Sequence, residues 1–187
     1  MKYIEAPNEY FPNSLETSIF LAGGITDCPN WQLELVELLK ETNLVIFNPR
    51  RKDFHPSKQE NIRQIEWEFR YLQKATAISF WFSEGSLQPI AMFEYGKWLR
   101  NFFSKQGKPL FVGIHPEFKR KFDIELQTNL EFAPYTASRE AANLPHHSLF
   151  YNDLCPLARA IKDWVLGREA YLERSSLFRT LVLHKED

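Results

Sequence analysis

Four short apolar segments rich in β-branched and aromatic residues divide the chain, and a polar or glycine-containing loop follows most of them. They are residues 17–24 (TSIFLAGG), 43–49 (NLVIFNP), 76–82 (TAISFWF) and 109–114 (PLFVGI). Continuous apolar runs of this length are typical of strands that are buried on both faces. We therefore predict four buried strands and a fifth short strand near Phe132, and we interpret residues 1–15 as an irregular lead-in.

Between these segments the apolar residues recur every three or four positions, which is the period of an amphipathic helix. The spacing predicts one helix that begins near Pro29 and further helices at 59–74, 89–104, 118–130 and 153–167. Strands that alternate with helices form a parallel sheet covered by helices on both faces. A length of 187 residues suits one domain, so we predict a single α/β domain over residues 1–187.

The carboxyl ends of the predicted strands carry polar residues and glycines from which a site can be built. They are Gly23-Gly24, Asn48-Pro49-Arg50-Arg51, residues 83–88 and His115-Pro116. Ligands of open parallel sheets bind at this edge. Two adjacent glycines let a sugar or phosphate approach the backbone closely. We interpret Arg50 and Arg51 either as a pair that holds a phosphate or as solvated loop residues.

Composition excludes several classes of protein. Hydrophobic residues make up 44% of the chain and charged residues 25%, which is typical of a folded domain. The formal net charge of -1 argues against a nucleic-acid partner, and no apolar run reaches the roughly 18 residues of a membrane span. The chain holds only two cysteines and starts without the layout of a signal peptide, so we expect a cytoplasmic protein.

Motifs for bound metals and cofactors are missing from the sequence. It contains no GxxxxGK[ST] phosphate loop, no GxGxxG dinucleotide-binding motif and no GxSxG nucleophile elbow. The pair His146-His147 has no partner at ligand spacing, and Cys28 lies far from Cys155. We therefore predict neither a metal nor a cofactor.

Glu94 is the first of two candidate catalytic carboxylates. On a helix its neighbours are Ile90, Ala91, Lys97 and Trp98, of which three are apolar or aromatic. A carboxylate in such surroundings, on the helix after a buried strand, is a candidate functional group. The alternative is a surface glutamate paired with Lys97.

Glu68 is the second candidate, and it differs from nearby Glu66 in its expected neighbours. Glu66 has Arg63 and Arg70 within one helical turn and is expected to form ion pairs in solvent. Glu68 has no positive partner among its neighbours Gln64, Ile65, Tyr71 and Leu72. The two side chains lie about 200° apart around a helix, so only one of them can point into a pocket. We predict that it is Glu68, the alternative being an exposed position on the helix shoulder.

The order of five segments resembles the nucleoside 2-deoxyribosyltransferase family in its divergent second branch. The segments are IFLAGGI, IFNPRR, IEWEFRYLQKATAISFWF, PIAMFEYGKWL and KPLFVGI. The resemblance covers a core at about residues 17–130 and leaves a C-terminal helical extension at about 150–187. It implies a flavodoxin-like parallel sheet of about five strands with helices on both faces. It also implies cleavage of the N-glycosidic bond of a nucleoside or nucleoside monophosphate, by 2-deoxyribosyl transfer to another base or by hydrolysis.

The same resemblance implies roles for single residues. Glu94 falls on the nucleophile, and Glu68 on the carboxylate that holds the sugar or moves the proton. Phe20 stands where well-studied transferases have Tyr, and Gln88 stands at a position where the family typically has Asp. These two departures favour an alternative, a non-catalytic nucleotide-binding module of the same fold. Trp67 is a candidate for stacking a base, although a place in the core fits it as well.

Aromatic residues are numerous enough to suggest a subunit interface as well as a core. The chain holds 16 Phe, 7 Tyr and 5 Trp against 7 Gly, and residues 177–183 form an apolar stretch. The resemblance points the same way, because sites in this family are commonly completed by a neighbouring subunit. We therefore expect a homodimer or a higher homo-oligomer that acts on a small nucleoside or nucleotide. Two further hypotheses remain open: a different glycosidase of the same fold group, and an interaction scaffold.

Overall fold

Five parallel strands form a single sheet in the order β1-β3-β2-β4-β5. The computed structural model describes residues 1–102, 107–140 and 150–183, and for 134–140, 171 and 173–183 it describes the backbone alone. The strands are β1 (Lys2–Glu5), β2 (Ser18–Gly23), β3 (Val45–Asn48), β4 (Ala77–Phe82) and β5 (Leu110–Ile114). The arrangement is the expected flavodoxin-like α/β fold.

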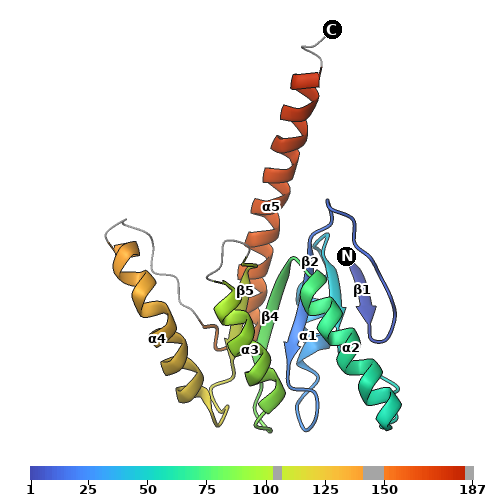
Figure 1. Ribbon diagram of the computed structural model, residues 1–187, viewed down its shortest axis with the longest axis vertical. Helices are drawn as coiled ribbons and strands as arrows, with labels where there is room; N and C mark the ends of the chain where they lie inside the picture. Colours follow the sequence, from blue (N-terminus) through green and yellow to red (C-terminus); the bar gives the residue numbers. More distant parts are fainter. Residues whose placement is uncertain (103–106, 141–149, 184–187) are drawn as a thin grey trace.

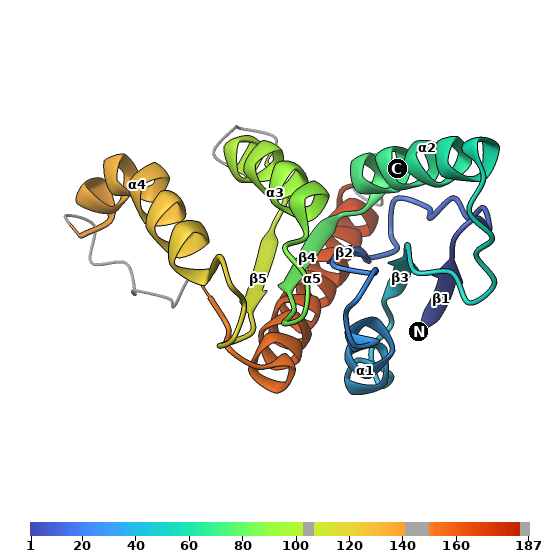
Figure 2. The same cartoon turned by 90° about the horizontal axis from the view of Figure 1, so that it is seen from below.

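Helices cover both faces of this sheet (Figure 2). Helices α2 (Lys58–Lys74) and α3 (Pro89–Phe102) lie on one face, with α4 (Lys121–Glu140) beside α3. Helices α1 (Trp31–Leu38) and α5 (Leu154–Leu183) lie on the other face. The second half of α5 projects well beyond the sheet (Figure 1).

Local sequence signals explain where helices α2 and α3 begin. The Ser57 hydroxyl accepts a hydrogen bond from the backbone N–H of Glu60 at 3.1 Å, so Ser57 caps α2. Pro89 occupies the first position of α3, where the missing N–H costs nothing. At the other end of α2 the Lys108 ammonium donates to the carbonyl oxygens of Leu72, Gln73 and Ala75. Both ends of α2 are therefore held in place.

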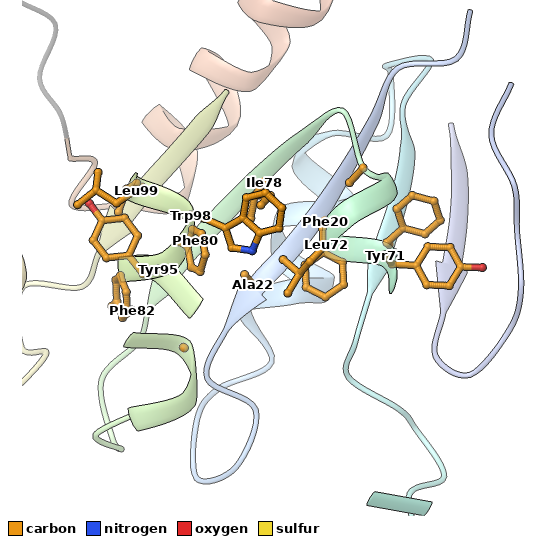
Figure 3. Close-up of a cluster of buried hydrophobic side chains, with 14 of the residues drawn as sticks. Phe20, Ala22, Tyr71, Leu72, Ile78, Phe80, Phe82, Tyr95, Trp98 and Leu99 are labelled. Atoms are coloured by element: carbon orange, nitrogen blue, oxygen red, sulfur yellow. The ribbon is translucent and has the colours of Figure 1, made fainter. Parts of the chain in front are cut away.

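Aromatic side chains fill the core between the sheet and helices α2 and α3 (Figure 3). The Trp67 ring lies 6.0 Å from Phe20 and 4.4 Å from Tyr71, measured between ring centroids. Further along the same layer, Tyr95 meets Phe80 and Phe82 edge to face. A second cluster, between the sheet and helices α1 and α5, contains aliphatic side chains and two tryptophans. Much of the aromatic excess is thus used in the core.

Two of the predicted elements are wrong. Residues 2–5 form the parallel edge strand β1, paired with β3, where we expected an irregular lead-in. Lys2 is exposed and the other three residues of β1 are only partly buried, so this strand lacks the continuous apolar run that marks the other four strands. Phe132 lies in α4 and not in a strand; it is buried on the same side of that helix as Ile124 and Thr128. After residues 141–149, the described chain resumes beside β5, and Tyr151 forms an isolated parallel bridge with Gly113.

Helices α2, α3 and α4 each leave two or more apolar side chains exposed. On α2, Ile62, Ile65 and Phe69 are 47%, 65% and 56% exposed, although their spacing is what predicted the helix. Ile90 and Phe93 on α3 are also exposed, as are Phe122, Leu126 and Leu130 on α4. Among the described residues, none of the helices has the length and apolar character that a bilayer crossing requires.

Candidate active site

A cavity of about 390 Å³ opens at the carboxyl edge of the sheet. Its wall consists of residues 22–27, at the end of β2 and in the loop after it, and residues 86–91, which lead from the loop after β4 into α3, together with Phe20, Pro49, Glu68 and Glu94. Strand β2 has β3 on one side and β4 on the other, so the chain changes direction across the sheet at this point. Open α/β sheets form their ligand crevice at such a switch of direction.

Two glutamates from different helices contribute to this wall. Glu68 lies on α2 and Glu94 on α3, and the side chains of both are partly buried. Glu66, two positions before Glu68, points away from the cavity and is exposed. The helical period accounts for this difference, because residues two apart point to nearly opposite sides of a helix.

The surroundings of the two carboxyls favour their protonated forms. Burial, together with the charge of Glu68, raises the pKa of Glu94 to about 7, although Lys97 opposes the rise. Burial also raises the pKa of Glu68, and a hydrogen bond from the Gln64 side chain opposes it. Because the charge of Glu68 is one cause of the raised Glu94 pKa, the protonation of the two carboxyls is coupled, as in sites that pair a general acid with a nucleophile.

Gln88 ties together the two loops that frame the cavity. Its Oε1 accepts from the Gly24 N–H at 2.9 Å, and its Nε2 donates to the Ser83 carbonyl oxygen at 2.6 Å. The backbone of Gln88 has a φ of 50°, in the left-handed region that side chains disfavour. We attribute this conformation to the position of its side chain, which is buried between the two loops.

Gly23 is required at the end of β2 by its backbone angle and by a close approach. Its φ is 153°, and a Cβ atom there would lie 2.3 Å from the carbonyl oxygen of Trp81. That atom belongs to the neighbouring strand and cannot move aside. The glycine thus lets the end of β2 approach the backbone of β4 closely, at the point where the loop of the cavity wall begins.

The family described as nucleoside 2-deoxyribosyltransferase like matches residues 16–128, more than half of the chain. The chain belongs to this family. The match includes all of the cavity wall, and it supports the resemblance drawn from the five sequence segments. It indicates a glycosyltransferase-like enzyme. No curated protein sequence matches the chain significantly.

Six of the ten site residues predicted for this member of the family lie in the cavity wall. They are Phe20, Gly23, Gly24, Glu68, Gln88 and Glu94. The wall does not contain the other four, which are Asn48, Arg50, Arg51 and Trp67. Each of these four donates hydrogen bonds to groups of the protein instead.

Arg50 and Arg51 illustrate why the remaining predicted residues lie elsewhere. The Arg50 guanidinium donates to the carbonyl oxygens of Ile25, Cys28 and Pro29, the last at 2.8 Å, and so supports the loop after β2. Arg51 forms an ion pair of 2.7 Å with Glu60. Both guanidinium groups thus bind groups of the protein, Arg50 through three backbone carbonyl oxygens and Arg51 through one carboxylate.

Asn48 and Trp67 are likewise engaged within the fold. The Asn48 Nδ2 donates to the Tyr3 hydroxyl on β1 at 2.7 Å, and its Oδ1 accepts from the backbone N–H of Arg50. Trp67 is fully buried behind Phe20 and donates its indole N–H to the carbonyl oxygen of Asn8. The reading of Trp67 as a core residue is the one that fits this position.

Sequence reasoning missed several residues that the fold brings to the cavity. Asp27 has a left-handed φ of 55° in the loop after β2, and no periodic pattern could have revealed its position. Leu87 and Ile90 form an exposed apolar rim and were not singled out. The one available signal was that residues 83–88 follow a buried strand.

The described residues hold no cluster of three or more His, Cys, Asp and Glu side chains that could bind a metal. His146 and His147 lie outside the described residues. The described cavity wall contains three carboxyls, those of Asp27, Glu68 and Glu94, and no Lys, Arg or His. The ionisable groups of the described cavity wall are therefore all acidic.

Proposed function

We propose that this chain cleaves the N-glycosidic bond of a nucleoside, either by 2-deoxyribosyl transfer to another base or by hydrolysis. The observation that carries the proposal is the pair of partly buried carboxyls, Glu68 and Glu94, which two helices direct into one cavity. Two carboxyls of which one is ionised and one protonated are the usual means of glycosidic cleavage. Membership of the family supports the same class of reaction.

The roles of the two carboxyls follow from the charges that the reaction develops. The Glu94 carboxylate attacks C1′ of the sugar, the bond from C1′ to the base nitrogen breaks, and its electron pair stays on the base. Glu68 gives its proton to the departing base. In the second half an acceptor base or water attacks C1′, the bond to Glu94 breaks with its electrons returning to the carboxylate, and the proton of the attacking group passes to Glu68.

A neutral nucleoside fits this site better than a nucleoside monophosphate. A phosphate carries a negative charge into a wall that already holds three carboxyls and, among its described residues, no cation. The nearby guanidinium of Arg50 is occupied by backbone carbonyl oxygens, and that of Arg51 by Glu60. We therefore place the free nucleoside ahead of the monophosphate as substrate.

One observation favours the second candidate function, a nucleotide- or nucleoside-binding module without catalysis. Phe20 contributes a ring without a hydroxyl to the cavity wall, so it cannot donate a hydrogen bond to a carboxylate of the pair. Among the described residues no hydrogen bond to the Glu94 carboxyl offsets the burial and the charge of Glu68 that raise its pKa. A site in this condition can still bind a nucleoside while reacting slowly.

Incubation with a panel of nucleosides and nucleoside monophosphates, with and without an acceptor base, tests the proposal. We expect release or exchange of the base with the unmodified chain, and loss of at least about 100-fold in rate with Glu94→Gln. Glu66→Gln is the matched control, because Glu66 is exposed on α2 and should leave the rate unchanged. Binding of nucleosides without any turnover would establish the binding module instead.

We also propose that the chain self-associates through the outer surfaces of α2 and α3. Six exposed apolar side chains gather there and reach the rim of the cavity: Ile62, Ile65, Phe69, Leu87, Ile90 and Phe93. Each of the six is between 47% and 73% exposed, and exposed apolar patches mark sites of protein interaction. The apolar stretch at 177–183, which also suggested association, has no described side chains.

Sedimentation or light scattering at micromolar concentration tests this association. We expect the unmodified chain to be a dimer or larger and Ile65→Glu to shift it toward the monomer. Leu166→Glu on α5 is the matched control, because Leu166 is similarly exposed at 64% but lies on the opposite side of the sheet. A monomeric unmodified chain would contradict the proposal.

A further inference from the structure

Gln64 contacts one of the two cavity carboxyls from outside the cavity wall. It lies one helical turn before Glu68 on α2, and its Nε2 donates to Glu68 Oε1 at 2.7 Å. The same nitrogen donates to the carbonyl oxygen of Pro49, also at 2.7 Å. Both N–H groups of the amide are thus used, one for the carboxyl and one for the end of β3.

The Pro49 carbonyl fixes the orientation of this amide. If the amide were turned over, Gln64 Oε1 would face the Pro49 oxygen and the Glu68 carboxylate, and an acceptor would meet two acceptors. In the observed orientation Gln64 Oε1 is buried without a hydrogen-bond partner among the described residues. Leaving an acceptor unsatisfied is unfavourable, so the two donated hydrogen bonds must outweigh it. The amide therefore meets Glu68 as a donor only.

We propose that Gln64 is a positioning residue that favours the ionised form of Glu68 over that of Glu94 and decides which oxygen of Glu68 can receive a proton. Because Gln64 only donates, Oε1 of Glu68 remains an acceptor, and a proton on Glu68 has to occupy Oε2. The donated hydrogen bond also stabilises the ionised form of Glu68 and so favours a proton on Glu94, whereas the reacting form of the site has the proton on Oε2 of Glu68 and an ionised Glu94. This inference rests on the proposed function in taking the two carboxyls as the reacting pair.

The charged groups around Glu68 leave this amide as its principal partner. Helix α3 presents Glu94, whose charge repels that of Glu68, and Lys97, which acts on Glu94. The loop after β2 brings Asp27 into the same cavity. From the other neighbouring segments, Arg50 and Arg51 are bound to carbonyl oxygens and to Glu60, and Glu9 is bound to Arg70 and Tyr71. Burial raises the pKa of Glu68, and the Gln64 hydrogen bond is what opposes that rise.

Site-specific titration of the two carboxyls tests the proposal. The side-chain carboxyl carbons of ¹³C-labelled glutamate are followed by NMR, and the signals are assigned with Glu68→Gln and Glu94→Gln. In Gln64→Met we expect the midpoint of Glu68 to rise by about one pH unit, since one hydrogen bond to its charged form is lost. The midpoint of Glu94 should fall, because a Glu68 that stays neutral no longer repels the charge on Glu94. Gln73→Met, at an exposed position of α2, is the matched control.

Movement in opposite directions distinguishes this role from a structural one. If Gln64 merely held α2 against β3, its loss would admit water and lower both midpoints together, and that result would overturn the proposal. Unchanged midpoints would overturn it as well. Gln64→Glu provides a second variant, because an ionised carboxylate cannot donate to Glu68 and should raise its midpoint further. The titration does not depend on turnover, so an inactive but titrating protein would refute the proposed function and leave the role of Gln64 standing.

Discussion

Replacing Glu94 by Gln should remove activity and at the same time stabilise the folded protein. Gln keeps the size of the side chain but carries no charge, and the charge is what the reaction needs and what folding disfavours. Burial and the charge of Glu68 raise the pKa of Glu94 from 4.5 to about 7. Between these two values the folded state binds more protons at this position than the unfolded state, so the free energy of unfolding falls as the pH rises.

The size of the effect follows from the difference between the two pKa values. A rise of about 2.5 pH units, at about 1.4 kcal/mol per unit, makes the ionised Glu94 side chain unfavourable by up to about 3 kcal/mol above pH 7. At pH 5 the same linkage gives only about 1 kcal/mol, because most of the folded molecules are still protonated there. Gln does not titrate. The gain in stability from Glu94→Gln should therefore be about 2 kcal/mol larger at pH 8 than at pH 5.

Urea unfolding at pH 5 and pH 8 measures this gain directly. The unmodified chain, Glu94→Gln and Glu66→Gln are compared at both values, and the exposed Glu66 should give a difference near zero at each. In parallel, base release is measured to establish that Glu94→Gln has lost turnover. A gain that does not grow between pH 5 and pH 8 would refute the view that this carboxyl is held in an unfavourable, partly buried position.

Three further predictions concern other residues of the site. Phe20→Tyr should place a hydroxyl in the cavity wall and lower the pKa of Glu94, which NMR titration measures. An unchanged pKa together with a loss of about 1–3 kcal/mol in unfolding free energy would mean that the hydroxyl finds no partner. Gly24→Ala puts a Cβ 2.6 Å from the Cδ of Gln88, so we expect it to break the hydrogen bond between Gly24 and Gln88 that joins the two loops. Base release should then slow at least about tenfold, and normal kinetics would argue against a role for this hydrogen bond. Arg50→Met removes the support of the loop after β2 and should raise KM for nucleoside and monophosphate equally, whereas a selective loss of the monophosphate would restore the phosphate-binding interpretation.

The periodicity of the sequence was enough to find four strands and the helices between them. Residues such as Ile19, Leu21 and Phe80 are buried on strands covered from both sides, so their segments are continuously apolar. Strand β1 has neither property, because none of its four residues is fully buried. Its pairing partner is Val45–Asn48, some 40 residues away, and nothing within Lys2–Glu5 announces it.

The candidate site likewise has some residues that the sequence predicts and some contacts that only the folded structure shows. Helical spacing singled out Glu68 over Glu66, and the position after a buried strand singled out Glu94, since both properties are local. Other contacts join segments that are far apart in sequence. The carbonyl oxygens that bind Arg50 and the hydrogen bond between Gln88 and Gly24 are examples. Local pattern determines which elements form and which side of an element a residue takes. Which polar group meets which is decided only when the elements pack, because hydrogen bonds depend on distances of about 3 Å that no spacing along the chain encodes.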